Sequence, residues 1–398
     1  MADLYTGTMD KIECRECGGT YHSLSVHVPR KHGMDLDTYK AAHEGAPTES
    51  DYGTWRRSQS QKVRAVREGR TLRDDTAAAG VETPVRPEPL HIGCAKLEIR
   101  ADLTPLDQRH VRAHDDKFVF NMDDLEDLAV ALEENDAVLI VGPTGNGKTS
   151  LAKMACTLYN QPIRRLNMDG DISRRDFLGE MEVAIDEATG QTITRWHDGI
   201  LPDAMRRGHT LLLDEWNLAP SHVRTTMQAV LEKPNAALNE RRELTLSANY
   251  GEVVRAHPEF RIIATANALG DEDPDYVGGF ATNAATQDRF GVVMKTGYLT
   301  ADDEATVVHS KSGLGRDLVK QMVKAANEVR DAKERESWMV TFSTRKLLDW
   351  AQKSVKYGGS NAAVRRTATL TVLNKIADPE DRQAVRGLLN RHGLADLH

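Results

Sequence analysis

The sequence predicts an α/β protein with a parallel β-sheet core, a helical C-terminal region and a small ββα-like module at the N-terminus. From about residue 96, apolar runs with the composition of buried strands alternate with helical patterns. Residues 299–398 carry patterns typical of helices, over 317–329, 344–357 and 362–376. Two cysteines and two histidines lie close together near the N-terminus, which predicts a metal-binding module there.

Composition limits the class of protein. The chain has 398 residues, which suits two or three domains, and its 40% hydrophobic and 28% charged content is ordinary for a soluble globular protein. A net charge of −8 gives the whole molecule no attraction to nucleic acid. The N-terminus lacks the features of a secretory signal, and no apolar run is long enough to cross a bilayer. Four cysteines, two of them in a Cys-x-x-Cys pair, suit a reducing compartment. We therefore expect a cytoplasmic protein with no membrane contact.

The N-terminal module has the spacing Cys-x2-Cys-x9-His-x4-His, formed by Cys14, Cys17, His27 and His32. Two thiolates and two imidazoles can close a tetrahedral Zn²⁺ site, and so short a segment needs a structural metal to fold. The alternatives are that the cysteines are incidental thiols, or that His22 replaces one ligand. The segment resembles the short bacterial fingers of the Ros/MucR regulators, which continue in the manner of 32–39 here.

A basic stretch follows this module. Its cations are Arg56, Arg57, Lys62, Arg64, Arg67, Arg70 and Arg73. Such a run can neutralise phosphates, so residues 12–73 are a candidate DNA or RNA contact. The alternative is a solvated helix face or linker, which charge runs usually are. Residues 74–91 have the composition of a flexible linker.

A phosphate-binding P-loop follows the first core strand. The apolar run 137–141 precedes Gly142-Pro143-Thr144-Gly145-Asn146-Gly147-Lys148-Thr149, and Ser150 continues into a helical pattern. Strand, glycine-rich turn and helix are the context that this motif requires. The glycines allow successive N–H groups to point at an anion. Lys148 would reach the β- and γ-phosphates of a nucleotide, and the Thr149 hydroxyl would ligate Mg²⁺.

Two further strands end in polar residues. The run 210–213 is followed by Asp214 and Glu215, and the run 260–266 is followed by Asn267. Carboxylates at the carboxyl end of a buried strand would lie beside the P-loop. Asp214 fits a magnesium ligand and Glu215 fits the base that activates the attacking water. Asn267 could bond the γ-phosphate or its water, but it is equally a common turn former.

In their order along the chain, these motifs resemble those of the AAA+ ATPases, and more narrowly the MoxR branch and the cobaltochelatase small subunit (CobS). The resemblance covers about 108–385. The matching stretches are 176–179, 198–202, 257–261, 264–267, 269–271, 287–290 and 343–346. It implies that Asn267 is sensor 1, that Arg345 is sensor 2, and that Arg289 reaches the γ-phosphate of the neighbouring subunit. Two features depart from the family: Asn217-Leu218-Ala219-Pro220 replaces a common Asn-Arg-Ala-Pro, and the zinc module and linker are additional.

The family also carries a β-hairpin inserted in its second helix, and residues 181–186 and 192–196 alternate as hairpin strands do around a turn at 187–190. The hairpin would project toward a ring pore or a partner; the alternative is a plain edge hairpin. We therefore expect a zinc-finger module (1–50), a basic segment and linker (51–95), an α/β nucleotide-binding core with the hairpin insert (96–298) and a helical lid (299–398).

The resemblance implies ATP as the substrate and Mg²⁺ as its cofactor. It also implies a hexameric homo-oligomer, because the arginine finger of a neighbouring subunit completes each site. It also implies a remodelling motor that acts on a protein with a von Willebrand A (VWA) domain. Two alternatives stay open. One is the ATPase subunit of a cobaltochelatase, and the other is a nucleic-acid-associated motor, of cellular or viral origin, recruited through its zinc finger.

Overall fold

The computed structural model describes residues 11–21, 23–25, 27–43, 46–50, 87–168, 171–185, 192–267, 288–336 and 340–396. The chain divides into two compact units, residues 1–85 and 86–398. Some features predicted from the sequence lie outside the described residues. These are His22, the basic stretch beyond residue 50, most of the linker, the hairpin turn at 187–190, and the segments 269–271 and Gln287.

The described residues of the N-terminal unit form a short hairpin and two short helical segments. Its elements are β1 (Ile12–Glu13), β2 (Thr20–Tyr21), the π-helical turn η1 (Val28–His32) and α1 (Leu36–Ala42). The side chain of Asp35 caps α1 by accepting from the N–H groups of Asp37 and Thr38. Among the described residues of this unit, only Leu24, Val28 and Tyr39 pack as large buried apolar side chains around Cys14. This core is small for a stable fold.

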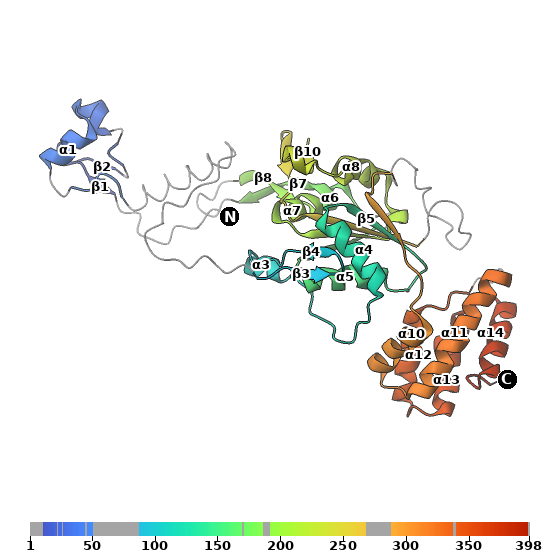
Figure 1. The fold of residues 1–398 in the computed structure, drawn as a ribbon. Coiled ribbons are helices and arrows are strands. Elements are labelled where there is room, and N and C mark those ends of the chain that lie inside the picture. Colours follow the sequence, from blue (N-terminus) through green and yellow to red (C-terminus); the bar gives the residue numbers. More distant parts are fainter. Residues whose placement is uncertain are drawn as a thin grey trace. The chain divides into compact units, whose positions relative to one another are not determined.

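The second unit is built on a five-stranded sheet in which every neighbouring pair is parallel (Figure 1). This confirms the predicted α/β class. The strands, in their order across the sheet, are β13 (Val292–Lys295), β5 (Ala137–Val141), β12 (Arg261–Ala266), β9 (Thr210–Asp214) and β6 (Ile163–Asn167). The register pairs Asn167 with Asp214, and Ala266 with Val141. The carboxyl ends of β6 and β9, and those of β12 and β5, are therefore level with each other at one edge of the sheet.

Helices cover both faces of this sheet, because successive strand residues point to opposite sides. On one side, Val138 and Ile140 pack with α4 (Met122–Glu133) and α5 (Lys148–Leu158). On the other side, Leu139 and the inward-facing residues of β9 pack with three helices. These are α6 (Arg174–Leu178), α7 (Ile200–Arg207) and α8 (Ser221–Leu231).

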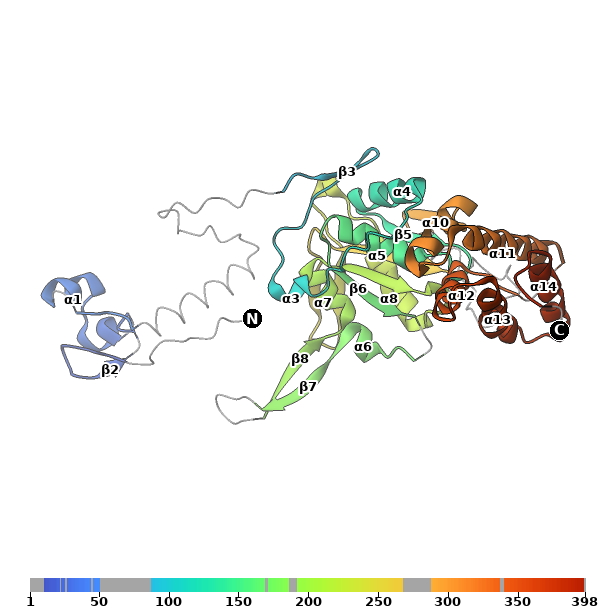
Figure 2. The ribbon, with the colours of Figure 1, turned by 90° about the horizontal axis from the view of Figure 1, so that it is seen from below.

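Within the described residues of the second unit, three antiparallel hairpins and several short helical turns are attached to the core. The hairpins are β3 (Leu90–Ile92) with β4 (Ala95–Leu97), β7 (Gly179–Ile185) with β8 (Thr192–Asp198), and β10 (Glu243–Leu246) with β11 (Glu252–Arg255). The short turns are α3 (Pro105–Gln108), η2 (Trp216–Leu218) and η3 (Ala236–Leu238). The pair β7–β8 lies between α6 and α7, as the predicted insert requires, and extends away from the sheet (Figure 2). Val183 and Ile185 are more than two-thirds exposed on this hairpin.

The C-terminal region is a helical bundle with its own apolar core, as predicted. Its elements are α10 (Ala301–Ser312), α11 (Arg316–Glu336), α12 (Thr344–Lys356), α13 (Asn361–Thr371), η5 (Leu373–Lys375) and α14 (Pro379–Arg391). The predicted helix over 362–376 is divided, since α13 ends before the turn η5. Within the described part of the chain, no helix combines the length and apolar character needed to span a bilayer.

Candidate functional site

The P-loop has the backbone geometry that its glycines permit. Gly145 and Gly147 have φ of +73° and +108°, a region that residues with a Cβ atom rarely adopt. At Gly142 the restriction is spatial, because a Cβ atom would overlap the backbone carbonyl of Thr296. The loop joins β5 to α5, and Lys148 is the first residue of that helix. The predicted strand, turn and helix are therefore present, with the helix N-terminus at the loop.

Lys148 lies inside the loop and is only 7% exposed. Its Nζ donates to the carbonyl oxygens of Gly142 (2.7 Å) and Pro143 (2.9 Å) and to Oδ1 of Asn267 (3.1 Å). Burial lowers the pKa of Lys148 to about 8, although the charges of Asp214 and Glu215 act in the opposite direction. The ammonium group therefore sits where an anion would stabilise its charge, and Asn267, predicted from a separate strand, lies against it.

Asp214 is the centre of a hydrogen-bond cluster at the end of β9. Its Oδ1 accepts from the hydroxyls of Thr149 (2.8 Å) and Thr265 (2.5 Å), and its Oδ2 accepts from Nε of Arg165 (2.8 Å). Burial of the 4%-exposed residue would raise the pKa of its carboxyl, but these hydrogen bonds outweigh burial and hold the pKa below the ordinary value. The sequence predicted Thr149 and Asp214 as magnesium ligands, and the structure places the two side chains together. Nothing in the sequence indicated Arg165 or Thr265.

Glu215 follows in a left-handed backbone conformation, with φ of +60°. A non-glycine residue in that region stores strain of about 1–3 kcal/mol, and such residues cluster at functional sites. The Glu215 N–H donates to the hydroxyl of Thr265 (3.2 Å), and its carboxylate makes no hydrogen bond or ion pair with another described residue. Next to it, the Asn217 side chain accepts from the N–H of Asn267 (3.4 Å). Glu215 and Asn267, the groups predicted at the ends of two strands, thus both lie near Lys148 of the P-loop.

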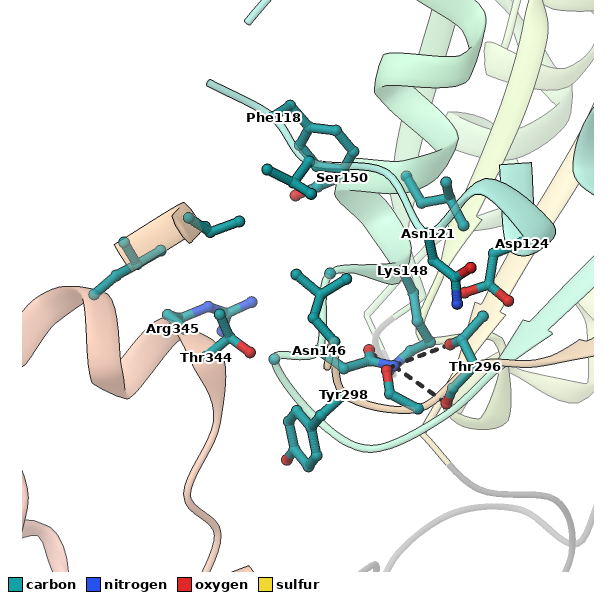
Figure 3. A pocket seen from close by; sticks show the side chains of 18 of the residues that line it. Phe118, Asn121, Asp124, Asn146, Lys148, Ser150, Thr296, Tyr298, Thr344 and Arg345 are labelled. Carbon is teal, nitrogen blue, oxygen red and sulfur yellow. Dashed lines mark hydrogen bonds between the residues drawn. The ribbon is translucent and has the colours of Figure 1, made fainter. Parts of the chain in front are cut away.

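A cavity opens beside the P-loop, between the sheet core and the helical bundle (Figure 3). Lys148 and Asn146 lie on one side of it, and Arg345 and Thr344, at the start of α12, lie on the other. The lining residues that sequence reasoning missed include Phe118, Val119, Asn121, Asp124, Thr296, Gly297, Tyr298, Leu299, Val307, Lys311 and Leu348. They come from the segment before α4 and its first turn, the segment after β13, and the bundle. No local motif marks them, because distant parts of the chain bring them together.

A buried ion pair fixes the start of α12, where Arg345 is located. The Arg330 guanidinium donates to both carboxylate oxygens of Glu304 at 2.8 Å, and Glu304 also accepts from the hydroxyl of Thr344. Glu304 is fully buried, so this pairing satisfies a charge that would otherwise be costly. Ser343 caps the same helix and lies close to Gly145 of the P-loop. Arg345 is therefore held at the cavity by structure on both sides of it.

Arg289 does not line this cavity. One guanidinium nitrogen, Nη1, donates to the Glu232 carboxylate (2.7 Å) and to the carbonyl of Gln228 (3.0 Å) near the end of α8. The next residue, Phe290, is buried and meets Trp216 edge to face, with ring centroids 5.8 Å apart. The fold therefore holds Arg289 near the end of α8, partly exposed and paired with Glu232.

The N-terminal unit brings together the four predicted zinc ligands. The ligand atoms of Cys14, Cys17, His27 and His32 all lie within 4.8 Å of one another. The distance from Sγ to Nε2 is 3.3 Å for Cys17 and His27 and 3.6 Å for Cys14 and His32, and the two histidine Nε2 atoms are 3.2 Å apart. Tetrahedral zinc, with Zn–S of about 2.3 Å and Zn–N of about 2.05 Å, would separate S from N by about 3.6 Å and N from N by about 3.4 Å. The donor set and its spacing therefore fit zinc.

Comparison with known families covers most of the second unit. Residues 137–290 match the AAA domain of the dynein-related subfamily. Residues 304–392 match the C-terminal domain of the CbbQ, NirQ and NorQ proteins. The first match contains the P-loop, Asp214, Glu215, Asn267 and Arg289, and the second contains Arg345.

Relatives match about two thirds of the chain. The aerobic cobaltochelatase subunit CobS of a Sinorhizobium species is 30% identical over 273 residues, which cover 67% of this chain and 78% of the relative. An uncharacterised protein of Staphylococcus haemolyticus is 29% identical over 276 residues, which cover 69% of this chain and 95% of the relative. Among solved structures, the RuvB Holliday junction branch migration motor of Thermotoga maritima has a TM-score of 0.40 at 14% identity, covering 72% of this chain and 76% of that chain. So slight a structural likeness carries no information on function.

Proposed function

This chain belongs to the MoxR- and CobS-like AAA+ ATPases, and we propose that it is a ring-forming motor that hydrolyses ATP to remodel a protein partner. Members of this family bind ATP and hydrolyse it. The observation that carries the proposal is one cavity that has Lys148 on its core side and Arg345 on its lid side, with Asp214 bonded to Thr149 beside it. The family, the fold and this arrangement all support ATP hydrolysis as the reaction.

We assign the phosphate chemistry to the polar groups at the strand ends. Lys148 and the P-loop N–H groups would hold the β- and γ-phosphates, and Asn267 and Arg345 would contact the γ-phosphate or its water. Glu215 would take the proton of the attacking water, since its carboxylate has no other described partner. Its half-buried position at the sheet edge supports that role.

The Thr149 hydroxyl and the Asp214 carboxylate would hold Mg²⁺, directly or through water. Both are hard oxygen donors, and they lie 2.8 Å apart, which suits a magnesium site shared with nucleotide phosphates. When bound, the ion would neutralise charge on the phosphates during transfer. Lys148 and Arg345 would supply the remaining positive charge around the γ-phosphate.

The ring follows from the role proposed for Arg289. Glu232 and Gln228 hold that side chain near the end of α8, and it has no contact with Lys148 among the described residues, which supports a contribution to the site of a neighbour. A closed ring of identical subunits gives every site a finger, and we propose the hexamer of the family. The exposed Val183 and Ile185 on the β7–β8 hairpin support a role for that insert in contacting a pore or a client.

We propose that the partner is a VWA-domain protein, as in the MoxR branch. A second candidate is the ATPase subunit of a cobaltochelatase, which the 30% identity to CobS favours. The N-terminal zinc module weighs against it, because a biosynthetic ATPase has no evident use for such a module. Arg30 and Lys31 are exposed on η1 and would support a nucleic-acid contact, but most of the predicted basic surface lies outside the described residues.

We propose zinc as a structural metal and the cytoplasm as the site of action. All four cysteines are free thiols, and a Cys2His2 site needs reduced cysteines. The small apolar core around Tyr39 supports a need for the metal. The four segments predicted above, with boundaries at 50, 95 and 298, stay our proposal for the domain organisation.

Replacing Lys148 with alanine tests the nucleotide site. We expect ATP affinity to fall by about 10- to 100-fold, because a charge-assisted contact to phosphate is lost. Binding of a fluorescent ATP analogue would measure this change. The control is Lys320→Ala, at an exposed position on α11, which should behave as wild type. Wild-type affinity in Lys148→Ala would rule out this loop as the nucleotide cradle.

Replacing Cys14 with serine tests the zinc site. We expect zinc content, measured by elemental analysis, to fall from about one ion per chain to near zero, because three ligands bind far more weakly than four. Amide exchange over residues 11–50 should rise sharply, while the second unit keeps its protection. Cys94→Ser is the matched control, since Cys94 is an exposed thiol of the second unit. Full zinc content in Cys14→Ser would contradict the assignment.

A further inference from the structure

We propose that Arg165 is a positioning residue of the magnesium site, which fixes the Asp214 carboxylate and weakens its attraction for Mg²⁺ until nucleotide is bound. The inference rests on the proposed function, because it takes Asp214 and Thr149 as the magnesium ligands. No sequence motif marks Arg165, and neither the family resemblance nor the P-loop mechanism uses it. Four observations support the role: the ion pair, its saturation of the carboxylate, the surrounding charges and the strand geometry.

Arg165 reaches Asp214 from the neighbouring strand. Its Nε and Nη2 contact Oδ2 of Asp214 at 2.8 and 2.5 Å. The register pairs Asn167 of β6 with Asp214 of β9, and Arg165 is two residues before Asn167. Residues two apart on a strand share a face, so the Arg165 side chain lies on the face of Asp214. Arg164 points to the other face, where it pairs with Asp203 of α7 at 2.6 Å.

The Asp214 carboxylate is saturated in this structure. It has two contacts with Arg165 at Oδ2 and one each with Thr149 and Thr265 at Oδ1. An ionised carboxylate has about four lone-pair sites, so a metal ion or its water must displace one of these donors. The Thr149 hydroxyl can turn and offer its oxygen to the metal. Arginine has no acceptor atom and keeps its charge. The metal would therefore approach Oδ1, while Arg165 stays on Oδ2.

The charge of Arg165 opposes the binding of a cation. It offsets the one negative charge of Asp214, and Lys153, on α5 one turn after Thr149, adds a further positive charge nearby. Burial, followed by the charge of Arg165, lowers the pKa of Lys153. Asp214 by itself would thus attract Mg²⁺ weakly. The negative phosphates of a nucleotide would reverse this balance, so the ion should load together with the nucleotide.

The experiment titrates Mg²⁺ into the full-length protein with a fixed concentration of a fluorescent ADP analogue, and records the magnesium concentration at half-maximal binding. Removing one positive charge next to the ion should lower that concentration by about three- to tenfold in Arg165→Gln. Arg165→Lys keeps the charge and should stay within about twofold of wild type. Arg164→Gln is the matched control, since it removes the same charge from the opposite face of the same strand.

The outcomes separate this inference from the proposed function. If magnesium has no effect on nucleotide binding in wild type, and Asp214→Asn changes nothing, the assignment of the magnesium ligands fails. Suppose instead that magnesium promotes nucleotide binding in wild type and that Asp214→Asn changes this response. If Arg165→Gln then needs as much magnesium as wild type or more, only the role of Arg165 is overturned. An equal shift in Arg164→Gln would reduce the effect to net charge and would also overturn it. Arg165→Thr suits an edge strand and replaces the glutamine variant should that variant not fold.

Discussion

Replacing Glu215 with glutamine should leave ATP binding intact and slow hydrolysis by about 10²- to 10⁴-fold, the usual contribution of a positioned base. Glutamine has the same shape as glutamate, so the left-handed backbone at this position and the contact of its N–H with Thr265 are kept. Its amide cannot accept a proton at neutral pH. The expected result is a protein that holds ATP and assembles but does not turn over. Equilibrium binding and phosphate release would measure the two halves of this expectation.

The matched control is Glu380→Gln, at an exposed acid in the first turn of α14. It should hydrolyse ATP at the wild-type rate. Hydrolysis at that rate by Glu215→Gln as well would remove the base role from Glu215. A loss of ATP binding in Glu215→Gln would instead indicate a structural role for the strained turn.

Replacing Arg289 with alanine should slow hydrolysis by about 10³- to 10⁵-fold while nucleotide binding persists, because the guanidinium acts on charge that develops in the transition state. The ion pair with Glu232 lies at the surface, and its loss should cost the fold less than about 1 kcal/mol. Single-turnover hydrolysis and thermal unfolding would separate a catalytic loss from a structural one. Wild-type hydrolysis by this variant would contradict the role of Arg289.

Mixing two inactive variants tests whether the site is shared between subunits. Arg289→Ala protein supplies intact P-loops and Lys148→Ala protein supplies intact fingers, so some interfaces in mixed rings regain both. At equal amounts, half of the subunits have an intact P-loop, and half of their neighbours have an intact Arg289. About one quarter of the interfaces should therefore be active. A mixture of Lys148→Ala and Thr149→Ala is the control, because neither protein has an intact P-loop. Absence of rescue at every mixing ratio would show that the site is complete within one chain.

The α/β class and the P-loop could be predicted because their signals are local. Gly145 and Gly147 have positive φ, and Lys148 begins a helix, so the turn is determined by residues next to one another in sequence. Continuous apolar runs also indicate buried parallel strands, as at 137–141 and 210–213. The spacing of the cysteines and histidines similarly predicted which four side chains converge in the N-terminal unit.

Other parts of the site depend on contacts between distant segments. The cavity wall around Phe118 and Leu348 joins chain parts more than 200 residues apart, and no short pattern predicts such a meeting. The surroundings of Asp214 depend on strand order, since β6 must lie next to β9 before Arg165 can reach the carboxylate. In the sequence, an arginine within a predicted strand indicates only a polar position at the edge of a sheet.

The amino-acid sequence alone thus determined the chemical groups that one turn or one strand end presents: the phosphate loop with Lys148, the carboxylates of Asp214 and Glu215, and the Cys2His2 set. Tertiary structure alone decided which groups face them, namely Arg165 on Asp214 and Glu232 on Arg289. The physical reason is that backbone conformation and capping act over a few residues, whereas packing and strand order bring together side chains whose separation in sequence carries no signal.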